Sequence, residues 1–342
     1  MAVTVVGLAA CATTVVPSIP SRADAPVTES QVRHVMSALA DDSMEGRMTG
    51  SRGSAKAATF IASQMRDIGL VPSGDSGYFQ RVPIALTRRS NGQERLTLLD
   101  DFTSLDTFPA DHRRPGVNVV GMIRGTDQLL ARQVVLVDAH YDHLGIGKAV
   151  KGDSIYNGAD DDASGTTAVL EIARSIAAGP PPKRTLLFVT TTGEEVGLLG
   201  TRWFIKHPPV SLKAVVSNLE IEMIGRPDSL AGGVGRAWLT GYARSNMGAM
   251  FAAAGLPIVA DARPSQHFFE RSDNIAYAQM GIPAHTMSTY NMHTDYHRPS
   301  DELSRIDFNH MTRVISEGVK AVRILADGPA PHWNPGGQPA AQ

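Results

Sequence analysis

Residues 134–143 read VVLVDAHYDH, an apolar run that ends in two histidines and two aspartates. A continuous run of apolar residues is typical of a strand that is buried on both faces of a sheet. Comparable runs lie at residues 118–123, 185–191, 214–221 and 284–288, and stretches with helical spacing separate several of them. Strands that alternate with helices indicate a layered α/β sheet.

Helical spacing of apolar residues predicts helices between these strands and at both ends of the folded region. One helix follows a capping box formed by Thr28 and Gln31. The others are expected at residues 55–68, 163–178, 195–206, 245–254 and 308–326. Short strand-like pieces at residues 81–86 and 94–99 lie in a stretch that glycine, proline and aspartate interrupt.

The chain has 342 residues, which at roughly 150 residues per domain would suggest two domains. The strand and helix pattern nevertheless runs without an internal linker or repeat from residue 28 to residue 326. We therefore expect one folded domain at residues 28–327. Residues 1–27 are expected to form a signal-like segment with a flexible tether, and the Pro- and Gly-rich residues 328–342 a disordered tail.

The composition excludes several classes of protein. Lys and Arg total 32 and Asp and Glu total 34, so the net charge is −2. This balance argues against nucleic acid as a partner, because binding a polyanion requires a basic excess or a basic stripe. Hydrophobic residues make up 42% of the chain, enough for a large core. The single cysteine, Cys11, excludes an intrachain disulfide and a cysteine-based zinc site.

The N-terminal residues resemble an export signal. The first charged side chain is Arg22, and residues 1–16 are small and apolar. Residues 8–11 read LAAC, which resembles the lipobox of bacterial lipoproteins, whose cysteine is acylated after cleavage. The basic residues that usually open such a segment are missing, so an ordinary cleaved signal and an apolar stretch without function remain alternatives. We expect export to the bacterial periplasm or cell envelope, with membrane contact only through a lipid on Cys11.

Five short segments concentrate His, Asp and Glu, and nearly all of them lie where a predicted strand ends. They are residues 139–143 (AHYDH), 158–165 (GADDDASG), 191–197 (TTGEEVG), 219–225 (LEIEMIG) and 293–301 (HTDYHRPSD). Open α/β sheets place their sites at such strand ends. Each segment alone also fits a surface pair, an acidic helix start or a polar loop. Together they offer neutral imidazoles and carboxylates, the ligands expected for zinc, with manganese or cobalt as substitutes.

A five-ligand set balances the charge of two metal ions. The candidate ligands are His140, Asp161, Glu195, Glu222 and His297. The three carboxylates contribute −3, two divalent ions contribute +4, and one hydroxide brings the sum to zero. Four ligands would suit one ion, whereas five ligands with a bridging carboxylate suit two ions about 3.5–4 Å apart.

In this order the five segments resemble metallopeptidase family 28, the two-zinc exopeptidases that include secreted bacterial aminopeptidases. The resemblance runs from about Leu39 to Asp307. It includes residues 42–47 (DSMEGR), 271–273 (RSD) and 281–284 (GIPA). It implies the zinc-dependent exopeptidase fold, with a central mixed, mostly parallel β-sheet flanked by helices on both faces.

The resemblance also implies a role for each ligand. His140 and Glu222 would hold one zinc, Glu195 and His297 would hold the other, and Asp161 would bridge both ions. The peptide substrate would need a free N-terminus, because its amine would lie near one of the ions.

Further residues are expected around the ions. Glu194 is implied to be the general base. Residues i and i+2 of an extended chain point the same way, so Asp142 is expected to accept a proton from the ring of His140 and fix its tautomer. The Asp161–Asp162 peptide bond is implied to be cis. The remaining candidates for contact with the ligands or the substrate are Asp162, His143, His267 and Asp273.

The chain departs from the family pattern at three positions. Glu222 stands where many members have Asp, Asn274 where many have His, and Phe269 where some secreted members have Tyr. These differences leave the choice of substrate open. The 36 residues from Pro83 to Asn118 are too few for the protease-associated domain that many relatives insert there. A single-zinc glutaminyl cyclase and a non-catalytic binding domain of the same fold remain alternatives to an aminopeptidase.

Overall fold

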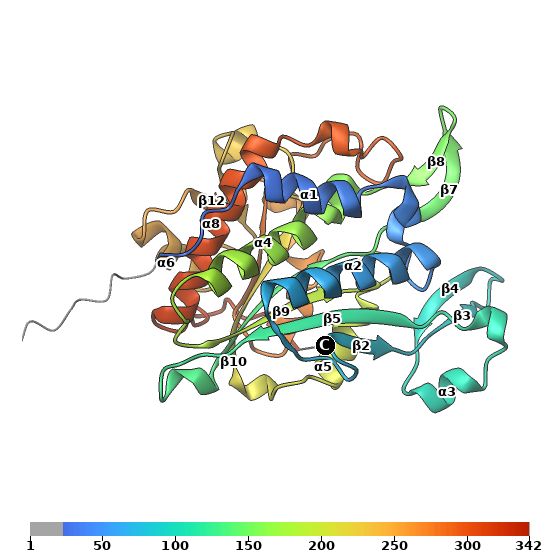
Figure 1. Cartoon of the computed structure of the whole chain (residues 1–342), viewed down its shortest axis with the longest axis horizontal. Helices are drawn as coiled ribbons and strands as arrows, with labels where there is room; N and C mark the ends of the chain where they lie inside the picture. Colours follow the sequence, from blue (N-terminus) through green and yellow to red (C-terminus); the bar gives the residue numbers. More distant parts are fainter. Residues whose placement is uncertain (1–22, 342) are drawn as a thin grey trace, which may run out of the picture.

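The computed structural model describes residues 23–341, which form a layered α/β fold (Figure 1). The strands are β1 (Val71–Pro72), β2 (Phe79–Val82), β3 (Ile84–Arg88), β4 (Glu94–Leu98), β5 (Gly116–Ile123), β6 (Val134–His140), β7 (Gly145–Val150), β8 (Asp153–Tyr156), β9 (Thr185–Thr191), β10 (Val215–Glu222), β11 (Ala237–Leu239), β12 (Ile258–Ala260) and β13 (Ala284–Ser288). The helices are α1 (Glu29–Leu39), α2 (Arg52–Ile68), α3 (Phe102–Asp106), α4 (Gly165–Ala178), α5 (Leu199–Lys206), α6 (Met247–Ala253), α7 (Asn274–Gln279) and α8 (Phe308–Asp327).

The main sheet is mixed, as expected, and has a parallel centre. Its order is β1-β5-β9-β6-β10-β13-β11-β12, with β2 also paired to β5. Strands β9, β6, β10 and β13 are parallel, whereas β5 and β11 pair antiparallel with this central group. Strand β6 lies between β9 and β10. After β6 the chain forms β9 on one side of it, and then crosses to form β10 on the other side. Open α/β sheets bind ligands at the carboxyl ends of strands at such a point.

Helices cover both faces of the sheet, which explains the uninterrupted apolar runs. Helices α1, α2 and α4 lie side by side over one face and are joined there by α8 (Figure 1). Helices α5 and α7 cover the other face. Every residue of β6 and β9 is buried.

Strand alternation decides which face the polar residues of β6 reach. Val135 and Val137 pack under α4, whereas Val134 and Leu136 belong to the core under α5 and α7. His140 has the same parity as Leu136, so its side chain points to the α5 and α7 side. On β10 the same alternation sends Leu219 and Ile221 toward α4 and leaves Glu220 and Glu222 on the side of His140.

Some elements differ from the sequence expectation. Helix α2 begins at Arg52, where Ser51 caps it, instead of at residue 55. Helix α5 begins at Leu199 instead of at residue 195, because residues 193–198 form tight turns in which Gly193, Gly197 and Leu198 have positive φ. The β7–β8 hairpin, which projects from the body in Figure 1, was not expected, because most of its side chains are exposed and show no apolar alternation.

Both ends of the described chain pack against the domain. Asp24 accepts hydrogen bonds from Arg323 of α8, and the amide of Ala25 donates to the carbonyl of Ser175 at 3.2 Å. The indole of Trp333 donates to the carbonyl of Gly281 at 2.9 Å. Hydrogen bonds thus hold Asp24, Ala25 and Trp333 against the domain, inside the segments expected to be a tether and a tail.

The proposed lipidation site lies outside the described residues, since these begin at residue 23. Within residues 23–341 every helix is too short or too polar to cross a membrane.

Candidate metal centre

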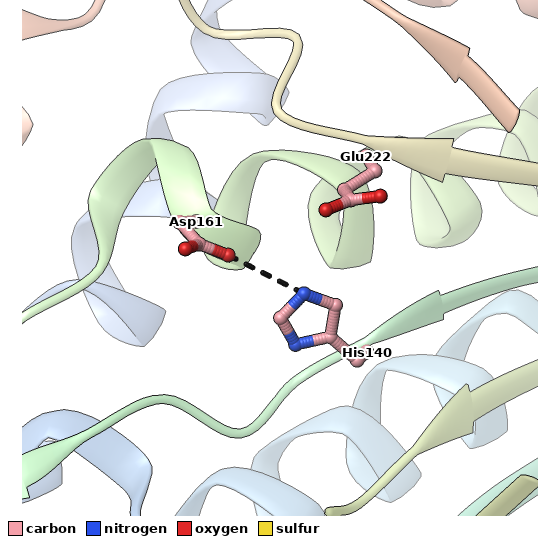
Figure 2. Close-up of side chains that lie close together, drawn as sticks. All are labelled: His140, Asp161 and Glu222. Carbon is pink, nitrogen blue, oxygen red and sulfur yellow. Dashed lines mark ion pairs between the residues drawn. The ribbon is translucent and has the colours of Figure 1, made fainter. Parts of the chain in front are cut away.

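Three of the expected ligands meet where β6 and β10 end. His140 is the last residue of β6, Glu222 is the last residue of β10, and Asp161 lies in the loop before α4. One ligand atom from each lies within 4.8 Å of the others. Nε2 of His140 is 3.3 Å from Oδ1 of Asp161, and the three side chains converge in Figure 2. This group matches the first metal position expected from the sequence.

A second group shares Asp161 with the first. Nε2 of His297 lies 3.2 Å from Oδ2 of Asp161 and 3.1 Å from Oε2 of Glu195. His143, Asp161 and Glu195 also place ligand atoms within 4.8 Å of one another. Asp161 therefore directs Oδ1 toward His140 and Oδ2 toward His297. This is the arrangement that a bridging carboxylate requires.

The hydrogen bonding of these atoms tests whether metal ions fit. Within residues 23–341, buried ligand atoms without a hydrogen-bond partner include Nε2 of His140, Oδ2 of Asp161, Oε1 of Glu195, Nδ1 of His143 and Nε2 of His297. Each unsatisfied buried polar group costs about 1–3 kcal/mol. Five such atoms at one place are explained by cations that bind them, and imidazole with carboxylate is a donor set that suits zinc. The residues present therefore fit two divalent ions.

Electrostatics support the same assignment. Burial, followed by repulsion from Glu220, raises the pKa of Glu222 to about 8. Burial also raises the pKa of Glu194 well above its ordinary value. Carboxylates that are this unfavourable in their charged form need nearby positive charge to stay ionised at neutral pH.

Asp162 holds the backbone around the site and belongs to neither ligand group. The Asp161–Asp162 peptide bond is cis, as expected. The carboxylate of Asp162 accepts hydrogen bonds from the amides of Gly165 at 2.8 Å and Met223 at 3.0 Å. It thereby ties the start of α4 to the residue that follows β10.

A buried ion pair connects the aspartate loop to the loop that carries His297. Oδ2 of Asp301 accepts hydrogen bonds from the amides of Asp160 and Asp161 at 3.0 and 3.1 Å. Its other oxygen accepts from Arg226 at 2.9 Å, and Arg226 also donates to Asp295 at 2.7 Å. Because Asp295 and Asp301 flank His297, this network places the histidine opposite Asp161.

The expected role of Asp142 is wrong in its detail. Nδ1 of His140 lies 3.1 Å from the backbone carbonyl of Asp142, in hydrogen-bonding geometry, and 3.8 Å from its carboxylate. The carboxylate instead accepts hydrogen bonds from the hydroxyl of Thr49 at 2.9 Å and from the amide of Glu194 at 3.1 Å. Asp142 therefore supports His140 through its backbone and positions Glu194 through its side chain.

Glu194 is placed beside the ligands without belonging to either group. Its side chain is 13% exposed, and its Oε2 lies 4.0 Å from Nε2 of His140. It lines a cavity together with Asp161 and Glu222. The carboxylate can therefore reach a water molecule or a substrate in this cavity.

The other three residues expected to contact the ligands or the substrate lie at different places. His267 belongs to neither ligand group; its side chain is 76% exposed on a loop that lines a separate cavity. Asp273 is buried below the ligands, where it accepts a hydrogen bond from the hydroxyl of Thr191 at 2.6 Å. His143 is buried beside Glu195.

Arg47 is a central residue whose role the sequence did not reveal. It is buried and donates hydrogen bonds to the carbonyls of Tyr141 at 2.7 Å, Asn157 at 2.6 Å and Gly158 at 2.9 Å. These carbonyls follow β6 and precede Asp161, so Arg47 joins the two segments that supply the first ligands. The sequence shows Arg47 only as part of the DSMEGR resemblance, which gives no partner for it.

The cavity beside Glu194 has a largely aromatic wall. Trp238 stacks on Phe268 with ring centroids 5.1 Å apart, and Tyr290 and Tyr296 complete this side. Tyr296 also stacks on the ring of His297, with ring centroids 3.9 Å apart. These aromatic residues come from three separate segments, so no pattern in the sequence indicates that they meet.

Comparison with known proteins assigns the family. The model of Peptidase family M28 matches residues 118–320. The chain belongs to peptidase family M28. The matched residues include all five candidate ligands and Glu194.

Two individual relatives are about a quarter identical to this chain over the residues that align. A vacuolar membrane protease of Verticillium alfalfae is 27% identical over 282 residues, which cover 72% of this chain and 26% of that protein. Aminopeptidase YwaD of Bacillus subtilis is 26% identical over 151 residues, covering 44% of this chain and 30% of its own. The chain thus spans only about a quarter of the first of these relatives.

The solved structures show the fold. A zinc aminopeptidase from Bacillus subtilis aligns with a TM-score of 0.64 and 16% identity, over 89% of this chain and 96% of its own. A glutaminyl cyclase from Porphyromonas gingivalis aligns with a TM-score of 0.61 and 16% identity, over 88% of this chain and 99% of its own.

We predict that Arg47→Met lowers the free energy of unfolding by about 2–5 kcal/mol, because it leaves several buried carbonyls without donors. Urea denaturation followed by circular dichroism measures the change. Arg52→Met is the matched control, since the Arg52 side chain is 75% exposed, and should change stability by less than about 0.5 kcal/mol. Equal effects of the two substitutions would contradict the central role of Arg47.

Proposed function

We propose that this M28 chain is a zinc-dependent aminopeptidase that hydrolyses N-terminal residues from peptides. The observation that carries the proposal is the pair of ligand groups that share Asp161, with the free carboxylate of Glu194 beside them. His140 and Glu222 would hold one zinc, Glu195 and His297 the other, and Asp161 both. When bound, two such ions lower the pKa of a water molecule toward about 7 and polarise the scissile carbonyl.

Glu194 is the group that moves protons in this proposal. Its amide is fixed by Asp142, while its carboxylate faces the cavity. The carboxylate takes a proton from the attacking water and then delivers it to the leaving amine, so the peptide C–N bond breaks without a net change in proton count. Burial raises the pKa of Glu194, and a raised pKa makes the carboxylate a stronger base.

The surroundings of Glu194 favour the end of a peptide chain. Glu194 lines the cavity and belongs to neither ligand group, so its carboxylate would attract the positively charged amine of a free N-terminus. The aromatic wall around Trp238 and Phe268 offers an apolar surface for the side chain of the first residue. A peptide would therefore enter with its N-terminal residue in this cavity.

Glutaminyl cyclase activity is the second candidate, because solved glutaminyl cyclases share the fold. Such an enzyme would use one zinc. The second ligand group around Glu195 and His297 favours two ions and thus hydrolysis. A non-catalytic binding domain is less consistent with the complete ligand set.

We also propose that the protein is exported to the bacterial periplasm or envelope and anchored by a lipid on Cys11. The apolar residues 1–16 and the LAAC sequence support this. Metabolic labelling with a tagged fatty acid should mark the native chain and not Cys11→Ser. Equal labelling of both would contradict the anchor.

The activity is tested with aminoacyl p-nitroanilides on protein whose zinc content is measured in the same sample. We expect about two zinc ions per chain, cleavage of these substrates, and loss of activity with a chelator that zinc restores. One zinc per chain with cyclisation of an N-terminal glutamine would instead identify a glutaminyl cyclase.

The role of Glu194 is tested by Glu194→Gln. This variant should retain both zinc ions and lose about 100-fold or more in kcat, because it removes the proton acceptor and keeps the ligands. Glu195→Gln is the paired comparison and should lose zinc. If Glu194→Gln turned over substrate at a near-normal rate, another group would have to be the base.

A further inference from the structure

His143 lies among the proposed ligands although the family pattern assigns it no metal. It follows β6 by three residues, and its side chain is fully buried. Its Nδ1 lies 2.8 Å from Oε1 of Glu195 and 3.8 Å from Oδ2 of Asp161. The ring therefore faces the same two carboxylates as His297.

The short contact between His143 and Glu195 does not have the geometry of a hydrogen bond. In the described part of the chain, both Nδ1 of His143 and Oε1 of Glu195 lack a hydrogen-bond partner, even though they are 2.8 Å apart. Two ligands of one tetrahedral zinc, each about 2.0–2.1 Å from the ion, lie roughly 3.3 Å apart. A close pair of buried atoms with no hydrogen bond between them is what a shared cation would explain, with Nδ1 as the deprotonated ring nitrogen.

His143 and His297 approach different oxygens of Glu195. Nε2 of His297 is 3.1 Å from Oε2, whereas Nδ1 of His143 is 2.8 Å from Oε1. The centroids of the two imidazole rings are 5.6 Å apart, and the ring planes make an angle of 73°. Glu195 is thus flanked by one imidazole on each side, and a neutral imidazole adds a ligand without changing the charge balance of the site.

The backbone fixes the ring of His143 in this position. A Cβ added at Gly158 would lie 2.5 Å from Cγ of His143, so only glycine fits against the ring. Gly158 has a φ of +54°, and its carbonyl accepts a hydrogen bond from Arg47. The ring therefore packs between the aspartate loop and Glu195, which limits its rotation.

We infer that Nδ1 of His143 is an additional protein ligand of the ion held by Glu195 and His297. This inference rests on the proposed metal centre. That ion then has four protein ligands, with Asp161, whereas the ion of His140 and Glu222 has three. Zinc with three protein ligands keeps a position for water or substrate, and zinc with four can expand to five-coordinate, so a water could still contact both ions. We expect the ion near His143 to be held more tightly than the ion near His140, which has the more open coordination.

Zinc X-ray absorption spectroscopy of the two-zinc protein tests the inference without measuring activity. Three histidine ligands shared by two ions give an average of about 1.5 imidazoles per zinc, whereas His140 and His297 alone give about 1.0. A value of 1.0 in the native protein would overturn the inference. This measurement needs no variant, so it does not depend on whether a substituted protein folds.

Zinc titration of metal-free protein against a chromophoric chelator gives the second readout. His143→Phe keeps a ring in the buried space and should weaken one of the two zinc sites by at least about 10- to 100-fold. His267→Phe, at an exposed histidine, is the matched control and should titrate like the native chain. If His143→Phe also titrates like the native chain, His143 is no ligand.

The outcomes separate the inference from the proposed function. Two bound zinc ions with about 1.0 imidazole per ion would leave the aminopeptidase proposal intact and refute only the role of His143. A native chain that binds no zinc or one zinc would refute the two-metal centre itself.

Discussion

Buried carboxylates without hydrogen-bond donors are the constraint on which the site depends. One layer deeper, Glu220 accepts hydrogen bonds from the hydroxyls of Ser272 and Thr286 and from two backbone amides. Among the described residues, Oδ2 of Asp161 and Oε1 of Glu195 have no such donors. Burying an ionised carboxylate without compensation costs far more than the stability of a domain provides. Divalent ions would supply the missing compensation, which explains why carboxylates gather at this place.

The rest of the centre keeps these carboxylates at fixed separations. Arg47 joins the end of β6 to the aspartate loop, and Asp301 with Arg226 joins that loop to the segment of His297. The carboxylate of Asp142 accepts a hydrogen bond from the amide of Glu194 and so fixes that residue relative to the same loops. Most of these contacts join a charged side chain to backbone atoms, and Arg226 with Asp301 joins two side chains, so the protein itself positions the ligands. In a preorganised site of this kind, the free energy of binding is not used to order the ligands, because they need not rearrange during the reaction.

Strand patterns and ligand chemistry could be predicted from the sequence, whereas loop conformations could not. The runs that became β6, β9 and β10 are continuous because helices cover both faces, and their ends carry His140 and Glu222 as expected. Asp142 was assigned to the wrong partner because the backbone turns after His140 and presents its carbonyl. The exposed position of His267, on a loop where its φ is positive, also has no counterpart in the sequence pattern. Such local geometry, like the packing of Trp333 against the domain, follows from tertiary contacts that periodicity does not encode.

The central claim is that Asp161 lies between two metal ions. Anomalous diffraction at the zinc absorption edge, from crystals of the native protein, tests it most directly. The account predicts two peaks about 3.5–4 Å apart, one beside His140 and Glu222 and the other beside Glu195 and His297, with Asp161 between them. A single peak, or peaks away from Asp161, would contradict the account.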